Sequence, residues 1–221
     1  ALARARAAAT PQRLARRQGE GEIVDDEGGI RLIAKIHPLE RYGGVYLEKH
    51  VELARHVEVQ LIFDGEDAIA LGDREVSLRK ERRRLIVESP APAIDQLHHR
   101  DAVRGAMWEA ASEVATRLGC LGLGTCHFVV DADAAFFFTG FTPSLQIEHP
   151  TIEMCLGIDL VEMQLRLAAG EASPPELRTV ESTGSALQAR VDASTDPVTG
   201  LAFASHVQSA RWPPAPQGKV R

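Results

Sequence analysis

Residues 139–150 read Thr-Gly-Phe-Thr-Pro-Ser-Leu-Gln-Ile-Glu-His-Pro, and this stretch decides the fold of the chain. It follows two apolar runs, residues 128–130 and 135–138, which predict paired strands around a turn. Gln146 and Glu148 come directly after this hairpin. We therefore expect both side chains to lie at a strand end and to line a pocket.

Regular elements extend outward from this segment in both directions. The clearest is a helix over residues 99–118, because its apolar side chains recur at three- and four-residue spacing. Further helices are predicted at residues 2–9, at about 26–41 and at 157–169. Strands are predicted at residues 23–24, 45–48, 57–63, 68–71, 187–191 and 205–211. This order predicts an α+β fold, with a mixed or antiparallel sheet flanked by helices.

The bulk composition narrows the class of protein. The chain has 221 residues, enough for one large domain or two small ones, and is 44% apolar and 25% charged, as in an ordinary soluble protein. No apolar run approaches the roughly 18–20 residues that span a bilayer. The net charge of −6 argues against a general nucleic-acid binder. Three cysteines without C-x-x-C spacing predict reduced thiols in an intracellular protein.

The first 19 residues contain five arginines and no acidic residue. This composition is similar to an organellar transit peptide, and the alternative that we favour is a solvated Ala/Arg helix inside a longer chain. We expect a cytoplasmic location, with an organellar matrix as the alternative.

Several segments resemble the ATP-grasp core of biotin carboxylases and follow one another along the chain in the same order. They are Leu47–His50, Arg55–Gln60, Asp73–Ser77, Glu88–Pro92, Gly124-Thr125, Gln146–Met154 and Leu165–Gly170. The resemblance covers about residues 20–221 and is strongest from 45 to 170. It implies an ATP-grasp fold with a reduced lid at residues 1–44, a core at 45–170 and the start of a C-terminal region at 171–221.

The resemblance also implies roles for individual residues. The backbone around Glu48, Lys49 and His50 would contact adenine, and His56 and Val129 would lie near the nucleotide. Gln146 would position bicarbonate and Glu148 would deprotonate it. The arginines Arg84 and Arg221 stand where the family has bicarbonate-site cations.

Four positions depart from the family pattern. The two metal-binding glutamates of the family fall on His127 and Gly140, its asparagine on Thr142 and its catalytic arginine on Ser144. Imidazole is a poor ligand for Mg²⁺, which prefers hard oxygen donors. The phosphate-covering loop, at residues 16–22, carries two glutamates that would repel phosphate.

Two other patterns have ordinary explanations that we favour. Residues 79–84 contain five basic side chains in six, which could form a nucleic-acid patch, but a solvated loop or edge strand is the simpler interpretation. The adjacent pair Cys126-His127 hints at zinc, although further ligands are missing from the pattern. We therefore predict no metal site of this kind and no nucleic-acid partner.

Two functional hypotheses follow from the resemblance and the departures. The first is a biotin-carboxylase-like module that has lost much of its ATP chemistry and serves as a structural subunit of a biotin-dependent carboxylase, in a homo- or hetero-oligomer. The alternative is an active enzyme that forms carboxybiotin from ATP, bicarbonate and biotin on a partner carrier protein, with a non-standard metal site. We expect weak ATP binding, leave Mg²⁺ open, and expect no membrane association.

Overall fold

The computed structural model describes residues 23–25, 31–36, 45–65, 67–80, 83–191 and 209. Chain contacts divide the protein into two compact units, residues 1–54 and 55–221, which are described separately. Several predictions concern positions outside the described residues. They are the helix at 2–9, the phosphate loop at 16–22, the strand at 205–211 except residue 209, and Arg221.

The first unit contains a three-stranded antiparallel sheet in the order β1 (Ile23–Asp25), β2 (Arg31–Ile36) and β3 (Val45–Lys49). The predicted helix at 26–41 is wrong, because β2 occupies its centre. The segment Arg-Leu-Ile-Ala-Lys-Ile lies between strands on both sides, and their pairing satisfies its backbone groups as a helix would. The predicted domain boundaries at 44 and 170 stay predictions.

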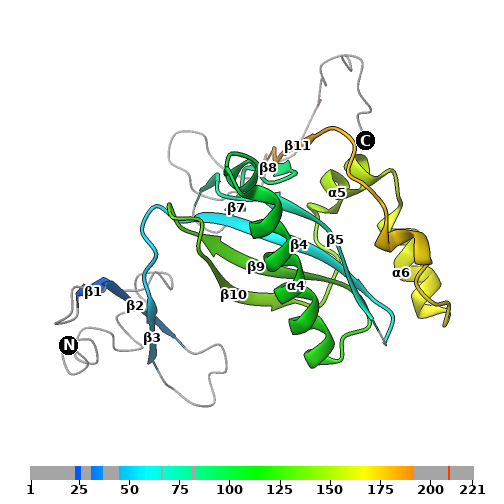
Figure 1. Cartoon of the computed structure of the whole chain (residues 1–221), viewed down its shortest axis with the longest axis horizontal. Helices are drawn as coiled ribbons and strands as arrows, with labels where there is room; N and C mark the ends of the chain where they lie inside the picture. The colour runs from blue at the N-terminus through cyan, green and yellow to red at the C-terminus, as the bar shows by residue number, and fades with distance from the viewer. Residues whose placement is uncertain are drawn as a thin grey trace. The chain divides into compact units, whose positions relative to one another are not determined.

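The second unit contains a six-stranded sheet in the order β10-β9-β4-β5-β8-β11, and each of its pairings is antiparallel. The strands are β4 (Arg55–Phe63), β5 (Ala68–Glu75), β8 (Ile86–Ser89), β9 (Gly122–Val130), β10 (Phe136–Thr142) and β11 (Ala186–Ala189). Helices flank this sheet (Figure 1). The predicted α+β fold is therefore confirmed.

Helix α4 (Arg100–Leu118) covers one face of the sheet, as predicted for residues 99–118 (Figure 1). Its buried stripe packs on the apolar side chains of β4 and β9. The stripe consists of Val103, Met107, Ala111 and Ala115. The helix ends at Gly119, whose φ of 59° is left-handed and favours glycine.

The helix predicted at 157–169 is present with a later start, and the helix before it was not predicted. The structure has α5 (His149–Leu156) and α6 (Leu160–Ala168), separated at Gly157, which adopts a φ of 70°. Asp159 begins α6 by accepting a hydrogen bond from the Glu162 backbone N–H. Gly157 therefore ends one helix instead of beginning the next.

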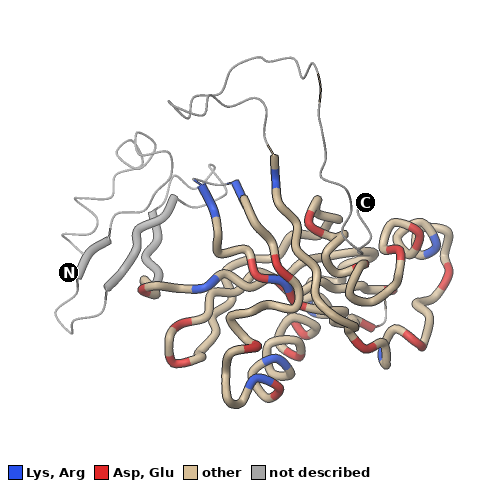
Figure 2. Tube along the Cα trace, turned by 90° about the horizontal axis from the view of Figure 1, so that it is seen from above, with Lys and Arg blue, Asp and Glu red and all other residues tan. Residues whose placement is uncertain are grey.

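Short elements complete the described fold. They are β6 (Arg79–Lys80), β7 (Arg83–Arg84), α3 (Pro92–Asp95) and the 3-10 helix η2 (Pro175–Arg178). Strands β6 and β7 pair with each other, so the basic segment contains a small two-stranded ladder. In the view of Figure 2, basic and acidic positions are interspersed along the described trace. Within this trace, no helix has the length and apolar character needed to cross a bilayer.

Candidate functional site

Arg74 is the centre of a buried polar cluster on the sheet face opposite α4. Its side chain is fully buried, and it donates from Nε to Glu58 Oε2 at 3.0 Å and from Nη1 to Gln60 Oε1 at 2.9 Å. Its Nη2 donates to Thr125 Oγ1 at 3.3 Å and to Gln146 Oε1 at 2.7 Å. One guanidinium thus links β4, β5, β9 and the segment before α5.

The alternation of side chains along β4 explains why this cluster forms. Val57, Val59 and Leu61 face the core under α4, so Glu58 and Gln60 must face the other side. Both polar side chains are almost completely buried. Buried polar groups need partners, and the arginine opposite on β5 supplies them.

Glu58 carries a stabilised negative charge. Its Oε1 accepts from Arg84 Nη2 and lies 3.1 Å from His127 Nδ1, while its Oε2 accepts from Arg74. Burial raises the pKa of this carboxyl, but the His127 hydrogen bond and the two arginine charges outweigh it and lower the pKa to about 2. Glu58 is therefore ionised at neutral pH.

Arg84 joins this cluster to the predicted catalytic carboxylate. Its Nη1 lies 3.0 Å from Glu148 Oε1, and Glu148 is buried with a relative exposure of 3%. The second oxygen, Oε2, is buried and has no partner among the residues that the structure describes. The structure therefore brings together Gln146, Glu148 and Arg84 as expected, and leaves one carboxylate oxygen able to accept a hydrogen bond.

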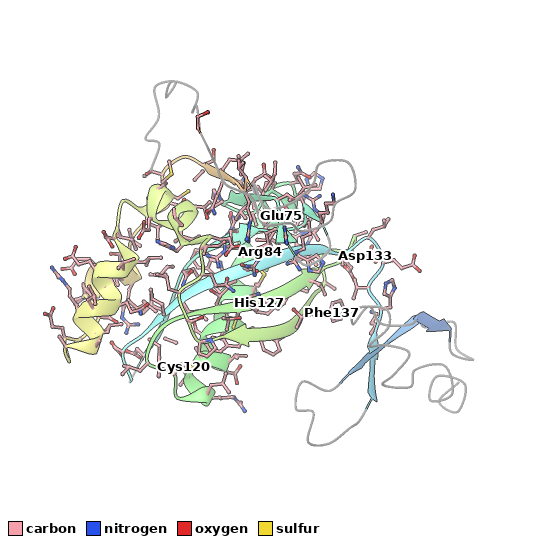
Figure 3. All side chains as sticks on the ribbon, turned by 180° about the vertical axis from the view of Figure 1, so that it is seen from behind. Glu75, Arg84, Cys120, His127, Asp133 and Phe137 are labelled. Atoms are coloured by element: carbon pink, nitrogen blue, oxygen red, sulfur yellow. The ribbon has the colours of Figure 1, made fainter. Side chains whose placement is uncertain are left out.

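His127 occupies a position between the cluster and β10. Its Nε2 lies 2.8 Å from Thr142 Oγ1, so both ring nitrogens have protein partners. Its register partner on β10 is Gly140, after an irregularity beyond Phe138, and a Cβ added to Gly140 would lie 4.0 Å from His127 Cδ2. The two positions that the resemblance assigns to metal ligands are thus adjacent, with room beside the glycine. Figure 3 labels His127 and Arg84.

These residues do not fit Mg²⁺. An imidazole, a glycine and a threonine hydroxyl stand at the altered positions, and the nearby carboxylate Glu58 is already engaged by His127, Arg74 and Arg84. Mg²⁺ prefers near-octahedral oxygen ligands, usually including carboxylates. Over the described ranges, no group of three His, Cys, Asp or Glu residues is arranged to hold a metal ion.

Two nearby sequence features lie outside the cluster. Asp131 Oδ1 accepts from the Asp133 and Ala135 backbone N–H groups, so this residue shapes the β9–β10 turn. Cys126 Sγ contacts the Ala111 carbonyl of α4 at 3.6 Å, and burial raises the pKa of this thiol to about 12. Because neighbouring strand residues face opposite sides, Cys126 and His127 do not form a zinc pair.

The predicted nucleotide residues fall into both units. Glu48, Lys49 and His50 belong to the first unit, where Lys49 is exposed and His50 Nδ1 is buried without a partner. His56 and Val129 belong to the second unit and are register partners on β4 and β9. Their nucleotide-binding roles stay predictions.

Sequence reasoning did not assign roles to Arg74, Glu58, Gln60 or Thr125. A signal for two of them was present, because Glu58 and Gln60 interrupt an otherwise apolar strand at two-residue spacing. Arg74 could not be linked to them from sequence, because the contact depends on the pairing of β4 with β5.

Comparisons with known proteins give consistent matches. Residues 36–175 match the family described as the ATP-binding domain of the carbamoyl-phosphate synthase L chain. The propionyl-CoA carboxylase alpha chain of Ruegeria pomeroyi is 37% identical over 158 residues, covering 71% of this chain and 22% of that protein. Biotin carboxylase 2 of Bacillus subtilis is 36% identical, covering 71% and 34%.

A solved structure agrees with these matches. A biotin carboxylase complex from Campylobacter jejuni aligns with a TM-score of 0.65 and 34% identity, covering 72% of this chain and 34% of that one. The chain thus spans about a third or less of the length of these relatives.

Proposed function

The chain belongs to the family of carbamoyl-phosphate synthase L chain ATP-binding domains and is a biotin-carboxylase-like ATP-grasp domain, and from this premise we propose that it is a catalytically impaired module with a structural role in a biotin-dependent carboxylase. Its relatives include chains of such carboxylases. Phosphoryl transfer from ATP depends on positioning and on neutralisation of phosphate charge, usually by Mg²⁺.

The observation that carries this proposal is the bridge made by His127. Its imidazole joins Glu58 to Thr142 through both ring nitrogens, at 3.1 and 2.8 Å. A metal ion at this position would have to displace a protein partner from the ring, and the one carboxylate there, Glu58, is already paired with Arg74 and Arg84. The bridge therefore replaces metal coordination by an internal hydrogen-bond network.

The charges of the cluster support the same conclusion. The ion pairs join two carboxylates, Glu58 and Glu148, to two guanidiniums, Arg74 and Arg84. These four charges balance without a divalent cation, so metal binding would add charge that the protein does not compensate. We expect the domain to bind Mg·ATP weakly for this reason.

A structural role implies a partner. We propose that the chain associates with other subunits of a biotin-dependent carboxylase, as a homo- or hetero-oligomer, and lies near a biotin carrier of that assembly. The compartment that we propose is the cytoplasm, with an organellar matrix as the alternative. No nucleic acid or membrane partner is part of this proposal.

The test is bicarbonate-dependent ATP cleavage by the unmodified protein. We expect no cleavage above background with Mg²⁺ or Mn²⁺. The matched variant restores His127→Glu, Gly140→Glu, Thr142→Asn and Ser144→Arg together, because such residues act as a unit. A gain of metal-dependent ATP binding in this variant alone supports the proposal.

The alternative function is an active carboxylase with a non-standard metal site. The observation in its favour is the Arg84–Glu148 pair, whose free Oε2 could accept a proton from a bound substrate. Bicarbonate-dependent cleavage by the unmodified protein at an ordinary enzymatic rate would establish this alternative and overturn the first proposal. Loss of that cleavage in Glu148→Gln would then place it at this site.

A further inference from the structure

A cavity of about 100 Å³ lies at the edge of β5, between α4 and α5. It shares no lining residue with the polar cluster around Arg74. Its lining comes from β5, the end of β8, both helices and the segment after η2. The lining residues are Leu71, Gly72, Asp73, Ser89, Pro90, Arg104, Trp108, Ile152, Cys155, Leu156 and Ser182.

The strand pairing explains why space remains here. Strand β8 pairs with β5 only at Glu88 and Glu75, and the chain then turns at Pro90 toward α3. The outer edge of β5 around Gly72 is consequently bordered by side chains of α4 and α5 and not by a strand.

The chemistry of the walls is mainly apolar. Leu71, Ile152 and Leu156 supply aliphatic surface, and Trp108 supplies an indole that is only partly buried. The indole is oriented by a hydrogen bond from Nε1 to Asp73 Oδ2, at 3.1 Å. Buried aromatic rings with a fixed polar end offer a rigid contact surface.

Asp73, Arg104 and Cys155 in the wall already have protein partners. Asp73 accepts from Arg104 Nε at 2.6 Å and from the Ala91 backbone N–H at 2.8 Å. Cys155 Sγ contacts the Ser89 carbonyl at 3.4 Å. A cavity whose polar atoms have partners offers little to water, and apolar cavities of this order accept small apolar molecules.

We propose that this cavity binds a small, mainly apolar molecule, of about one ring or one branched alkyl group, against Trp108. Ligand pockets are commonly concave and apolar, with a few polar groups that fix orientation. Ser182 is exposed, so the lining reaches the surface on that side. This proposal is independent of whether the polar cluster supports catalysis.

The test uses fluorobenzene as the probe and the full chain as the protein. Binding is followed by ¹⁹F NMR line broadening, with competition by toluene. A second readout is tryptophan fluorescence in a Trp212→Phe background, which leaves Trp108 as the single tryptophan. We expect saturable broadening that toluene reverses, together with a saturable change in Trp108 emission.

Cavity variants decide whether the probe binds at this site. Leu156→Phe fills the space and should weaken binding at least about tenfold, which corresponds to a difference of about 1.4 kcal/mol. Leu165→Phe makes the same change on the exposed surface of α6 and should leave binding unchanged. If Leu156→Phe fails to fold, Cys155→Met is the second filling variant. Absence of saturable binding, or equal binding in a folded filling variant, would overturn the proposal.

Discussion

Two adjoining parts of the polar cluster, one around Arg84 and Glu148 and one around His127, differ in how their polar groups are paired. Around Arg84 and Glu148, charged groups are retained, buried and paired, with one carboxylate oxygen left free. Around His127, the site has an imidazole and a hydroxyl that bond to each other beside an open glycine position. The first part has a carboxylate oxygen that can accept a further hydrogen bond, whereas in the second part both nitrogens of the His127 ring already have protein partners.

The difference shows that ion pairs and neutral hydrogen bonds lie side by side in one buried network. Arg74 links both parts, because it holds Glu58, which contacts His127, and also holds Gln146 beside Glu148. If the proposed loss of a metal site is correct, the charges beside that site have been kept. The following variants examine each part in turn.

The largest loss of stability is expected when Arg74, which contacts both parts, is replaced. Arg74→Met removes one of the two guanidiniums paired with Glu58 and the donor to Gln146, and breaking a buried ion pair from one side should cost about 4 kcal/mol of unfolding free energy. Urea denaturation at neutral pH measures this loss. Arg117→Met, which removes an exposed pair with Glu113, should change stability by less than about 0.5 kcal/mol. Equal, small losses in both variants would mean that the network holds neither part in place.

The next effect concerns pH. The pKa of Glu58 is lowered from 4.5 to about 2 in the folded protein, so its contribution is full above pH 4.5 and is lost as pH falls toward 2. This shift corresponds to roughly 3 kcal/mol. Stability curves of the wild type and Glu58→Gln should therefore converge as pH falls through this window. Parallel curves would show that Glu58 is not held ionised.

Substitution of two glycines by alanine should change stability by different amounts, because Gly124 is tightly packed and Gly140 is not. A Cβ on Gly124 would lie 2.5 Å from Phe141 Cζ, so Gly124→Ala should cost about 2 kcal/mol through overpacking. A Cβ on Gly140 meets only His127 Cδ2 at 4.0 Å, so Gly140→Ala should leave stability nearly unchanged. Thermal unfolding of both variants tests this contrast. A large loss in Gly140→Ala would mean that the altered part is tightly packed.

The smallest loss of stability is expected when the His127 side chain, which joins Glu58 to Thr142, is removed. His127→Ala removes two side-chain hydrogen bonds from a site that is partly exposed, and should cost about 1 kcal/mol. His99→Ala is a suitable control, because this side chain is exposed and makes no capping bond at the start of α4. Chemical denaturation of both variants gives the comparison. If His127→Ala and His99→Ala change the free energy of unfolding equally, the hydrogen bonds of His127 do not stabilise the fold.

Sequence patterns predicted most of the second unit. The α4 stripe and the alternation in β4 depend on local burial, which periodicity reports directly. The helix expected at 26–41 was wrong because tertiary pairing of β2 with β1 and β3 overrides local propensity. The helix expected at 157–169 is present but begins at Leu160, because Gly157 is the cap of the preceding helix α5, which was not predicted.

The candidate site was predictable only in part. Gln146, Glu148 and Arg84 were expected from resemblance, and the structure places them together, although their roles stay predictions. The central position of Arg74 could not be predicted, because its four partners come from three separate segments of the chain, β4, β9 and the segment before α5. Only the register of neighbouring strands brings these groups within hydrogen-bond distance.

We propose that the segment around His127 and Gly140 does not hold a divalent metal together with a nucleotide. Titration of Mn²⁺ followed by electron paramagnetic resonance, with a non-hydrolysable ATP analogue present, measures this directly. We expect the unmodified protein to remove no more Mn²⁺ from solution than the nucleotide alone does. The variant with all four substitutions, at 127, 140, 142 and 144, should remove more. Stoichiometric, nucleotide-dependent Mn²⁺ binding by the unmodified protein would contradict the claim.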